Sequence, residues 1–269
     1  MLDVRMAHTG SKRSENERRS SGRDFVGALQ KGLAVIQALG ASQSRLSLSE
    51  VARASGLTRA AARRYLLTLA TLGYAESDGR RFALTPLVLR LGYAYFSSAS
   101  LPKLAQPVLE RIGERTHEVA SIAVLDGADI LFLARSARRR ILSASIGIGT
   151  RLPAYCTAMG RVLLAARSDA EIERFLKATR AKKLTPKTKT GYRALLEAIL
   201  SARRQGYAMS DEELEIGLRS IAVPVTDSRG LTRLAMSVSL HAARMTPAQT
   251  VERLLPELRA GAEKLSAMI

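Results

Sequence analysis

The pattern of hydrophobic and polar positions divides the chain into a polar start, a short helical region and a longer mixed region. Residues 1–23 show no apolar periodicity, and their six lysines and arginines outnumber three acidic residues. This composition predicts a disordered basic arm. From 24 to 85, helical spacing of apolar residues gives way to two short alternating runs, which predicts a small helical domain that ends in a hairpin.

The first apolar period predicts a helix in "DFVGALQKGLAVIQALG". Asp24 is suited to cap its start, and Gly40 to end it. Its apolar residues recur at helical spacing, at Phe25, Leu29, Leu33, Ile36 and Leu39.

A second helix start is marked in "LSLSEVARASG", where Ser47 and Glu50 have the spacing of a capping box. Gly56 is a plausible end for this helix, and Thr58 opens the next one. A short helix, a glycine turn and another helix predict a helix-turn-helix. The buried stripe expected along the second helix consists of Ala62, Leu66, Leu69 and Leu72.

The segment "YAESDGRRFAL" predicts strand, Asp-Gly turn and strand. A hairpin directly after the second helix is typical of the wing of a winged helix. The pair Thr85-Pro86 then marks the start of a linker helix over 86–100.

Residues 101–269 predict an antiparallel α+β domain, because hairpins alternate with helices. "VASIAVL" and "ILFLARSA" form one strand pair, "ILSASIG" is a further strand, and a second hairpin turns at Asp227–Gly230. The predicted helices run from Leu101-Pro102 to near Thr116, over 157–166, 169–178 and 191–205, and from Thr246-Pro247 onward.

The net charge of the chain indicates which class of partner it binds. The 269 residues carry a formal net charge of +18. Such an excess attracts polyanions, chiefly nucleic acid or an anionic membrane, although an inert basic surface has the same composition. No apolar run is long enough for a membrane span, and one cysteine with three histidines offers no metal-ligand spacing. A lone cysteine and the lack of a secretory signal favour the cytoplasm.

The basic residues of the helical domain are placed for contact with double-stranded DNA. Arg59 and Arg63 are four residues apart, so they share one face of the second helix. The expected DNA-binding residues are Thr58, Arg59, Ala60, Arg63 and Arg64 on that helix, with Arg80 and Arg81 at the wing tip. The alternative is a small helical domain whose arginines are only solvated.

No catalytic set accompanies these features, so we expect no enzyme and no cofactor. Cys156 is a possible nucleophile whose pKa Arg151 and Arg161 could depress, but an isolated cysteine is more often packed in a core. "SDEELE" has no partner acid or nucleophile, and "GIGTR" lacks the residues of a phosphate loop.

Four segments in order resemble the IclR family of bacterial transcription regulators: "LSLSEVARASGLTRAAARRYLLTLATLGY", "RLPAYCTAMGRVLLA", "DEELEIGLRSIAVPVTDSRG" and "LAMSVS". The forms "LTRAAARRYLLTL" and "ASIGIGTRLPAYCTAMGRVLL" are most similar to the subgroup that controls the β-ketoadipate pathway. The resemblance implies a winged helix that binds a palindromic operator as a homodimer or dimer of dimers. It also implies a GAF-like effector-binding and oligomerisation domain over 101–269. Ala60 and Ala61 depart from the Ser-Thr that many members carry.

The resemblance further implies a site for a small aromatic or dicarboxylic acid. Its residues, matched by motif, are Leu152, Ala158, Met159, Ser210, Leu218, Ser220, Ser237 and Ser239, with Ala144 a weaker match. Ser237 and Ser239 alternate along one strand, so both hydroxyls can point the same way, although an exposed strand face gives the same pattern. Arg151 and Arg219 flank these motifs and could bind a carboxylate.

The leading hypothesis is therefore a ligand-responsive DNA-binding regulator. The alternative is a small-molecule enzyme with an appended nucleic-acid-binding domain, and a third possibility is a constitutive architectural DNA binder. The sequence does not decide between activator and repressor, between dimer and tetramer, or among operators and effectors.

Overall fold

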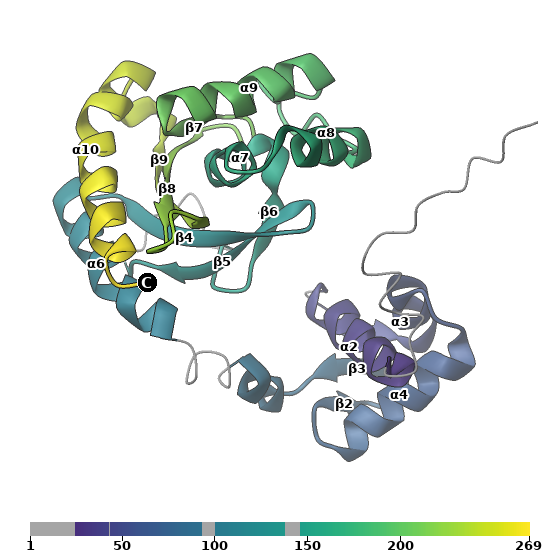
Figure 1. The fold of residues 1–269 in the computed structure, drawn as a ribbon. Coiled ribbons are helices and arrows are strands. Elements are labelled where there is room, and N and C mark those ends of the chain that lie inside the picture. Colours follow the sequence, from purple (N-terminus) through teal and green to yellow (C-terminus); the bar gives the residue numbers. More distant parts are fainter. Residues whose placement is uncertain (1–24, 43, 93–99, 138–145) are drawn as a thin grey trace, which may run out of the picture. The chain divides into compact units, whose positions relative to one another are not determined.

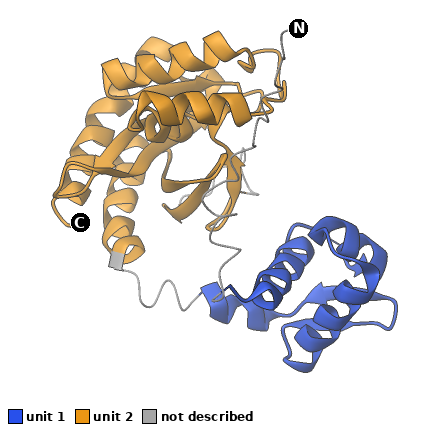
Figure 2. Cartoon of the chain, turned by 45° about the vertical axis from the view of Figure 1, so that its right-hand side comes forward, with its two compact units in different colours: residues 1–95 blue, residues 96–269 orange. Residues whose placement is uncertain are grey.

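The computed structural model describes residues 25–42, 44–92, 100–137 and 146–269, and of Ser100 only the backbone. The chain divides into two compact units, Met1–Tyr95 and Phe96–Ile269 (Figure 2). The predicted arm over 1–23 and the predicted cap Asp24 lie outside the described residues.

The first unit consists of helices packed beside a small antiparallel sheet (Figure 1). Its elements are α2 (Gly27–Gly40), β1 (Leu46–Ser47), α3 (Leu48–Ser55), α4 (Arg59–Thr71), β2 (Ala75–Ser77) and β3 (Arg81–Leu84). The strands follow the order β1-β3-β2. The predicted helix-turn-helix and wing are thus confirmed, and β1 is an addition that pairs Leu46 with Phe82.

Local capping explains where these helices begin and end. Ser47 Oγ accepts a hydrogen bond from the Glu50 amide at 3.4 Å, and Glu50 Oε2 accepts one from the Ser47 amide at 2.7 Å, so the predicted capping box is present. Gly56 ends α3 with φ 68°, a conformation that glycine adopts without steric cost. Thr58 caps α4 by accepting a hydrogen bond from the Ala61 amide at 3.2 Å.

The core of the first unit contains only part of the predicted apolar stripes. Its buried residues are Val35, Leu39, Val51, Leu66, Leu69 and Ala75. Leu72 was expected in the buried stripe, but it is 58% exposed because α4 ends at Thr71. Leu29 and Leu33 are also exposed, since only the C-terminal half of α2 contributes residues to this core.

The structure describes the connection between the two units only at its two ends. Thr85 accepts a hydrogen bond from the Leu87 amide at 3.3 Å and so caps a short 3-10 helix, η1 (Pro86–Val88). Residues 89–92 continue as helix. The rest of the predicted linker helix over 86–100 lies outside the described residues, apart from Ser100.

The second unit is a six-stranded antiparallel sheet with helices on both faces (Figure 1). The strands follow the order β6-β5-β4-β9-β8-β7. They are β4 (Val119–Asp126), β5 (Asp129–Arg135), β6 (Arg151–Pro153), β7 (Ala208–Asp211), β8 (Leu218–Thr226) and β9 (Thr232–His241). The helices are α6 (Ser100–Thr116), η3 (Ala154–Cys156), α7 (Ala158–Ala165), α8 (Asp169–Ala178), α9 (Tyr192–Gln205), η4 (Ala242–Arg244) and α10 (Pro247–Ser266).

Alternation along the strands sends side chains to two separate cores. One face packs against α6 and α10, with Ile122, Met236 and Val238 among its buried residues. The other face packs against α7, α8 and α9, with Ala123 and Ala235 among its buried residues. The predicted α+β class, both hairpins and the five predicted helices are confirmed. The strand predicted at "ILSASIG" falls mostly on 138–145, outside the described residues.

Candidate functional sites

The exposed surface of α4 and the wing carries the predicted DNA-binding residues. Thr58, Arg59, Ala60, Arg63 and Arg64 are all exposed. Because Thr58 Oγ1 acts as an acceptor for the helix cap, its own hydroxyl proton stays available to an outside acceptor. Within the described ranges, no ion pair engages the arginine side chains of α4, so nothing in this unit opposes their binding to phosphates or base edges.

The two wing arginines are not equivalent. Asp78 Oδ1 accepts hydrogen bonds from the amides of Arg80 at 2.9 Å and Arg81 at 2.7 Å, and these bonds lower the pKa of Asp78. The Arg81 guanidinium donates to the Arg45 carbonyl at 3.2 Å, whereas Arg80 extends from the turn. Arg81 thus links the wing to the segment before β1, although both side chains are exposed.

The second unit contains a cavity between the sheet and the start of α7. Apolar walls come from Ile130, Phe132, Leu152, Met159 and Leu218. The cavity is narrow, because the centres of water-sized spheres can occupy only about 30 Å³ of it. Its lining marks it as a candidate small-molecule site, because apolar walls with a few polar groups are typical of such sites.

Polar groups converge on this cavity from neighbouring strands. Ser121 of β4 pairs with Ser237 of β9, and Ser239 pairs with Ser220 of β8. All four serines line the cavity, so Ser237 and Ser239 do share one strand face. The Ser237 hydroxyl is buried and has no hydrogen-bond partner among the described residues.

A cationic side chain that the sequence did not predict also lines the cavity. Arg135 lies at the end of β5 directly opposite Ser121, and its guanidinium donates to the Ile146 carbonyl. A β-bulge in the pairing with β4 shifts the register beside Leu133, and so turns Arg135 to the same face as Phe132. Burial lowers the pKa of the Arg135 guanidinium.

Of the ten residues predicted for the effector site, seven line the cavity: Leu152, Ala158, Met159, Leu218, Ser220, Ser237 and Ser239. Three do not. The Ser210 hydroxyl donates to the Cys156 carbonyl at 2.7 Å. Arg151 pairs with Asp126 at 2.6 Å, and Arg219 pairs with Asp211 at 2.6 Å. Both arginines neighbour lining residues in their strands, so alternation turns them to the other face. Ala144 lies outside the described residues.

Cys156 is part of the core and not an activated thiol. Its side chain is buried, and burial raises its pKa to about 11. Arg161 lowers this pKa by its charge, but the effect of burial is larger. The predicted influence of Arg151 is wrong, because its guanidinium is held by Asp126 and Asp129.

Other kinds of site are not seen in the part of the chain that the structure describes. No group of three or more His, Cys, Asp or Glu side chains there could hold a metal ion. Over the same residues, every helix is too short or too polar to cross a membrane.

A winged helix-turn-helix in one unit and a cavity lined by apolar and hydroxyl side chains in the other are typical of a DNA-binding regulator with a sensor domain. The family model described as "Bacterial transcriptional regulator IclR C-terminal" matches residues 93–267, and the "IclR helix-turn-helix domain" matches residues 28–79. The chain belongs to the IclR family of transcriptional regulators.

Individual relatives show which members of the family this chain is similar to. The "Pca regulon regulatory protein" of Pseudomonas putida is 45% identical, over 90% of this chain and 84% of the relative. A crystal structure of a protein from Rhodococcus sp. RHA1 is 47% identical, with a TM-score of 0.77 over 90% of this chain and 98% of that one. A double mutant of the PobR inducer binding domain from Acinetobacter, in complex with 3-hydroxybenzoic acid, is 34% identical. Its TM-score is 0.61 over 64% of this chain and all 100% of that one.

These matches decide between the two main hypotheses from the sequence. The matched families and relatives are transcriptional regulators and not enzymes, and the chain is a regulator. The alternative of an enzyme with an appended DNA-binding domain is therefore wrong.

Proposed function

We propose that this regulator controls genes of aromatic-acid breakdown in response to a small aromatic acid bound in the cavity. One observation carries the proposal: the Ser237 hydroxyl is buried inside the cavity and lacks a hydrogen-bond partner among the described residues. An unpaired buried polar group costs free energy, and a ligand oxygen would relieve that cost.

The groups around Ser237 fit a planar ligand with one negative end. Arg135 supplies a cation, and its guanidinium matches the geometry of a carboxylate. Phe132, Leu152 and Leu218 supply apolar contact for a ring. Hydroxyls such as Ser220 and Ser239 can then bond phenolic oxygens.

An aromatic monocarboxylate fits this cavity better than a dicarboxylate. Among the described lining residues, Arg135 is the only cation. A second carboxylate would therefore be buried without a partner of opposite charge, which is costly. The PobR inducer binding domain, whose double mutant is solved in complex with 3-hydroxybenzoic acid, supports the aromatic class.

For DNA binding, we propose that α4 enters the major groove of operator DNA. Arg59, Arg63 and Arg64 would contact bases and phosphates from the helix, with Thr58 and Ala60 at its start. Arg80 would contact the flanking backbone, and Arg81 would chiefly fix the wing. A single recognition helix per chain supports binding as a homodimer on a palindromic operator, with a dimer of dimers as the larger form. Because it acts on DNA, we place the protein in the cytoplasm.

A thermal-shift screen of the full-length protein tests the ligand proposal. We expect protocatechuate, 4-hydroxybenzoate or 3-hydroxybenzoate to raise the melting temperature, because a ligand that binds only the folded state stabilises it. β-Ketoadipate serves as the dicarboxylate comparison, and it should stabilise less. If no aromatic acid stabilises the protein, the proposed ligand class is wrong.

A further inference from the structure

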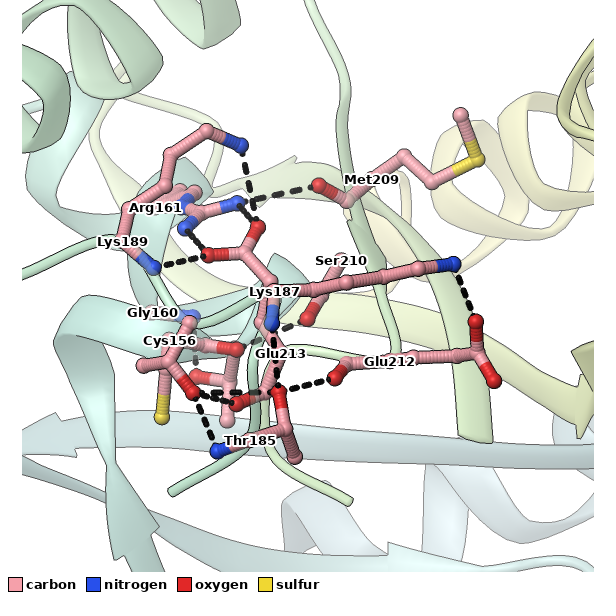
Figure 3. Close-up of polar contacts among 12 residues, drawn as sticks. Cys156, Gly160, Arg161, Thr185, Lys187, Lys189, Met209, Ser210, Glu212 and Glu213 are labelled. Atoms are coloured by element: carbon pink, nitrogen blue, oxygen red, sulfur yellow. Dashed lines mark hydrogen bonds and ion pairs between the residues drawn. The ribbon is translucent and has the colours of Figure 1, made fainter. Parts of the chain in front are cut away.

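A buried ion pair lies beside the cavity but does not line it. Arg161 of α7 and Glu213, which follows β7, are 2% and 3% exposed. Two short contacts join them, Nη1 to Oε1 and Nη2 to Oε2, each at 2.6 Å (Figure 3). Replacing such a pair with apolar residues often leaves stability unchanged or raises it. Stability alone therefore does not account for these charges.

The pair joins two walls of the cavity. Arg161 lies in the same helix as Ala158 and Met159, which line the cavity from the first turn of α7. Glu213 directly precedes Leu214, which lines the cavity from the segment between β7 and β8. The distance between these two walls is therefore set in part by the Arg161–Glu213 contact.

A third segment, residues 185–189, also contacts Glu213 and the preceding Glu212. Thr185 Oγ1 donates to the Glu212 carbonyl and Thr188 Oγ1 to the Glu213 carbonyl, each at 2.6 Å. Lys189 contacts the Glu213 carboxylate through its amide and its ammonium, both at 3.1 Å. Figure 3 shows Thr185 and Lys189 converging on Glu212 and Glu213.

The backbone at this point is strained. Glu212 has φ 55°, a left-handed conformation that is uncommon for residues other than glycine. Such a conformation persists only where the surroundings fix it, and it is frequent at ligand clamps. The contacts of Glu213 with Arg161 and with the 185–189 segment supply that constraint.

We propose that Arg161 and Glu213 are positioning residues for the effector site, which hold Leu214 and the first turn of α7 in register for ligand binding. This inference rests on the proposed function, because it assumes that the cavity binds the effector. The two side chains do not touch the ligand; they act through the walls that they join.

The decisive variant replaces the pair by apolar residues, Arg161→Met with Glu213→Leu, because this change removes the contact without leaving a buried charge. The matched control is Arg204→Met with Glu197→Leu, an exposed ion pair of the same unit. We expect the decisive variant to bind protocatechuate or 4-hydroxybenzoate about tenfold more weakly than the parent in calorimetry, with no change for the control.

Hydrogen exchange of the ligand-free protein tests the same contact without any effector. Amides over 157–160 and 212–217 should exchange about tenfold faster in the decisive variant, because both walls lose their common anchor. If that variant does not fold, Arg161→Lys carries the test, since it keeps the charge but loses the second contact. Unchanged exchange together with unchanged effector affinity would overturn the inference. If the parent binds no acid but its variant exchanges faster, the ligand proposal fails, and the pair is shown only to hold the two walls together.

Discussion

At the scale of single residues, the cavity is defined by side chains whose bonding is incomplete or costly. Ser237 has a buried hydroxyl without a partner among the described residues, and such a group costs about 1–3 kcal/mol. The half-buried Arg135 lines the same cavity and lies opposite Ser121 in the strand pairing. A ligand oxygen that bonds the Ser237 hydroxyl would remove this cost, which is why we propose that Ser237 contacts the effector.

Cys156 provides a prediction about reactivity. With its pKa raised to about 11 by burial, the thiol stays protonated at pH 8 and should resist iodoacetamide until the protein unfolds. Mass spectrometry of the native and the urea-treated protein measures this difference. The variant Cys156→Ser should keep its DNA binding and its effector response. Rapid labelling of the native protein would show instead that the thiol is activated.

Glu213 provides a prediction about pH. Burial would raise the pKa of its carboxyl, but hydrogen bonds and the charges of Arg161 and Lys189 outweigh burial, and the folded-state pKa lies below 4.5. The pair therefore contributes stability above pH 4.5 that is lost as the pH falls through the folded-state value. Cys156, the other titratable group that acts on Glu213, stays neutral over this range.

The measurement is urea unfolding of the parent and of Glu213→Gln between pH 7 and pH 3. The difference in unfolding free energy should stay constant down to about pH 5 and shrink at lower pH. A difference that is the same at every pH would show that the charge of Glu213 contributes nothing.

At the scale of elements, we propose that α4 and the wing have different roles in DNA binding. Arg59→Ala and Arg63→Ala should each cost about 1–3 kcal/mol of operator affinity if the side chain bonds a guanine. Arg80→Ala should weaken operator and random DNA alike and reduce the salt dependence, because phosphate contacts release counterions. Equilibrium binding at several salt concentrations separates the two effects. An equal loss for operator and random DNA at all three positions would contradict this division.

Local chemistry made most of these elements predictable. Ser47 with Glu50 and Ser168 with Glu171 form capping boxes, and Thr246 caps the last helix; each uses residues within one turn. The hairpin turn of the wing depends on Asp78 in the same way. Such signals lie entirely within a few residues, so the sequence displays them.

Features set by distant pairing could not be predicted. Strands β1, β6 and β7 are only two to four residues long, which is too short for a clear alternating pattern. The strands that pair with β1 and β6 also lie far from them along the chain. Arg135 escaped prediction because strict alternation from Phe132 turns it away from the cavity, and only the bulge restores it. Arg151 and Arg219 looked suitable by position, but their acidic partners could not be inferred from the sequence.

At the scale of the whole molecule, a net charge of +18 attracts DNA in general, and α4 with the wing would supply recognition. We predict that footprinting will show two half-sites about one helical turn apart, because each chain offers one recognition helix. Analytical ultracentrifugation should then give at least two chains per operator. One unpaired half-site occupied by a single chain would contradict the dimer.

The central claim is that the cavity binds a small aromatic acid through the Ser237 hydroxyl. Calorimetry of the full-length parent, Ser237→Ala and Ser228→Ala with protocatechuate and 4-hydroxybenzoate tests it most directly. Ser228 is the control, because it lies exposed at the turn of the same hairpin. We predict that the parent and Ser228→Ala bind one of these acids equally well and that Ser237→Ala loses about 1–3 kcal/mol of binding free energy. Binding of the acid by Ser237→Ala with the affinity of the parent, or no binding by any of the three proteins, would contradict the account.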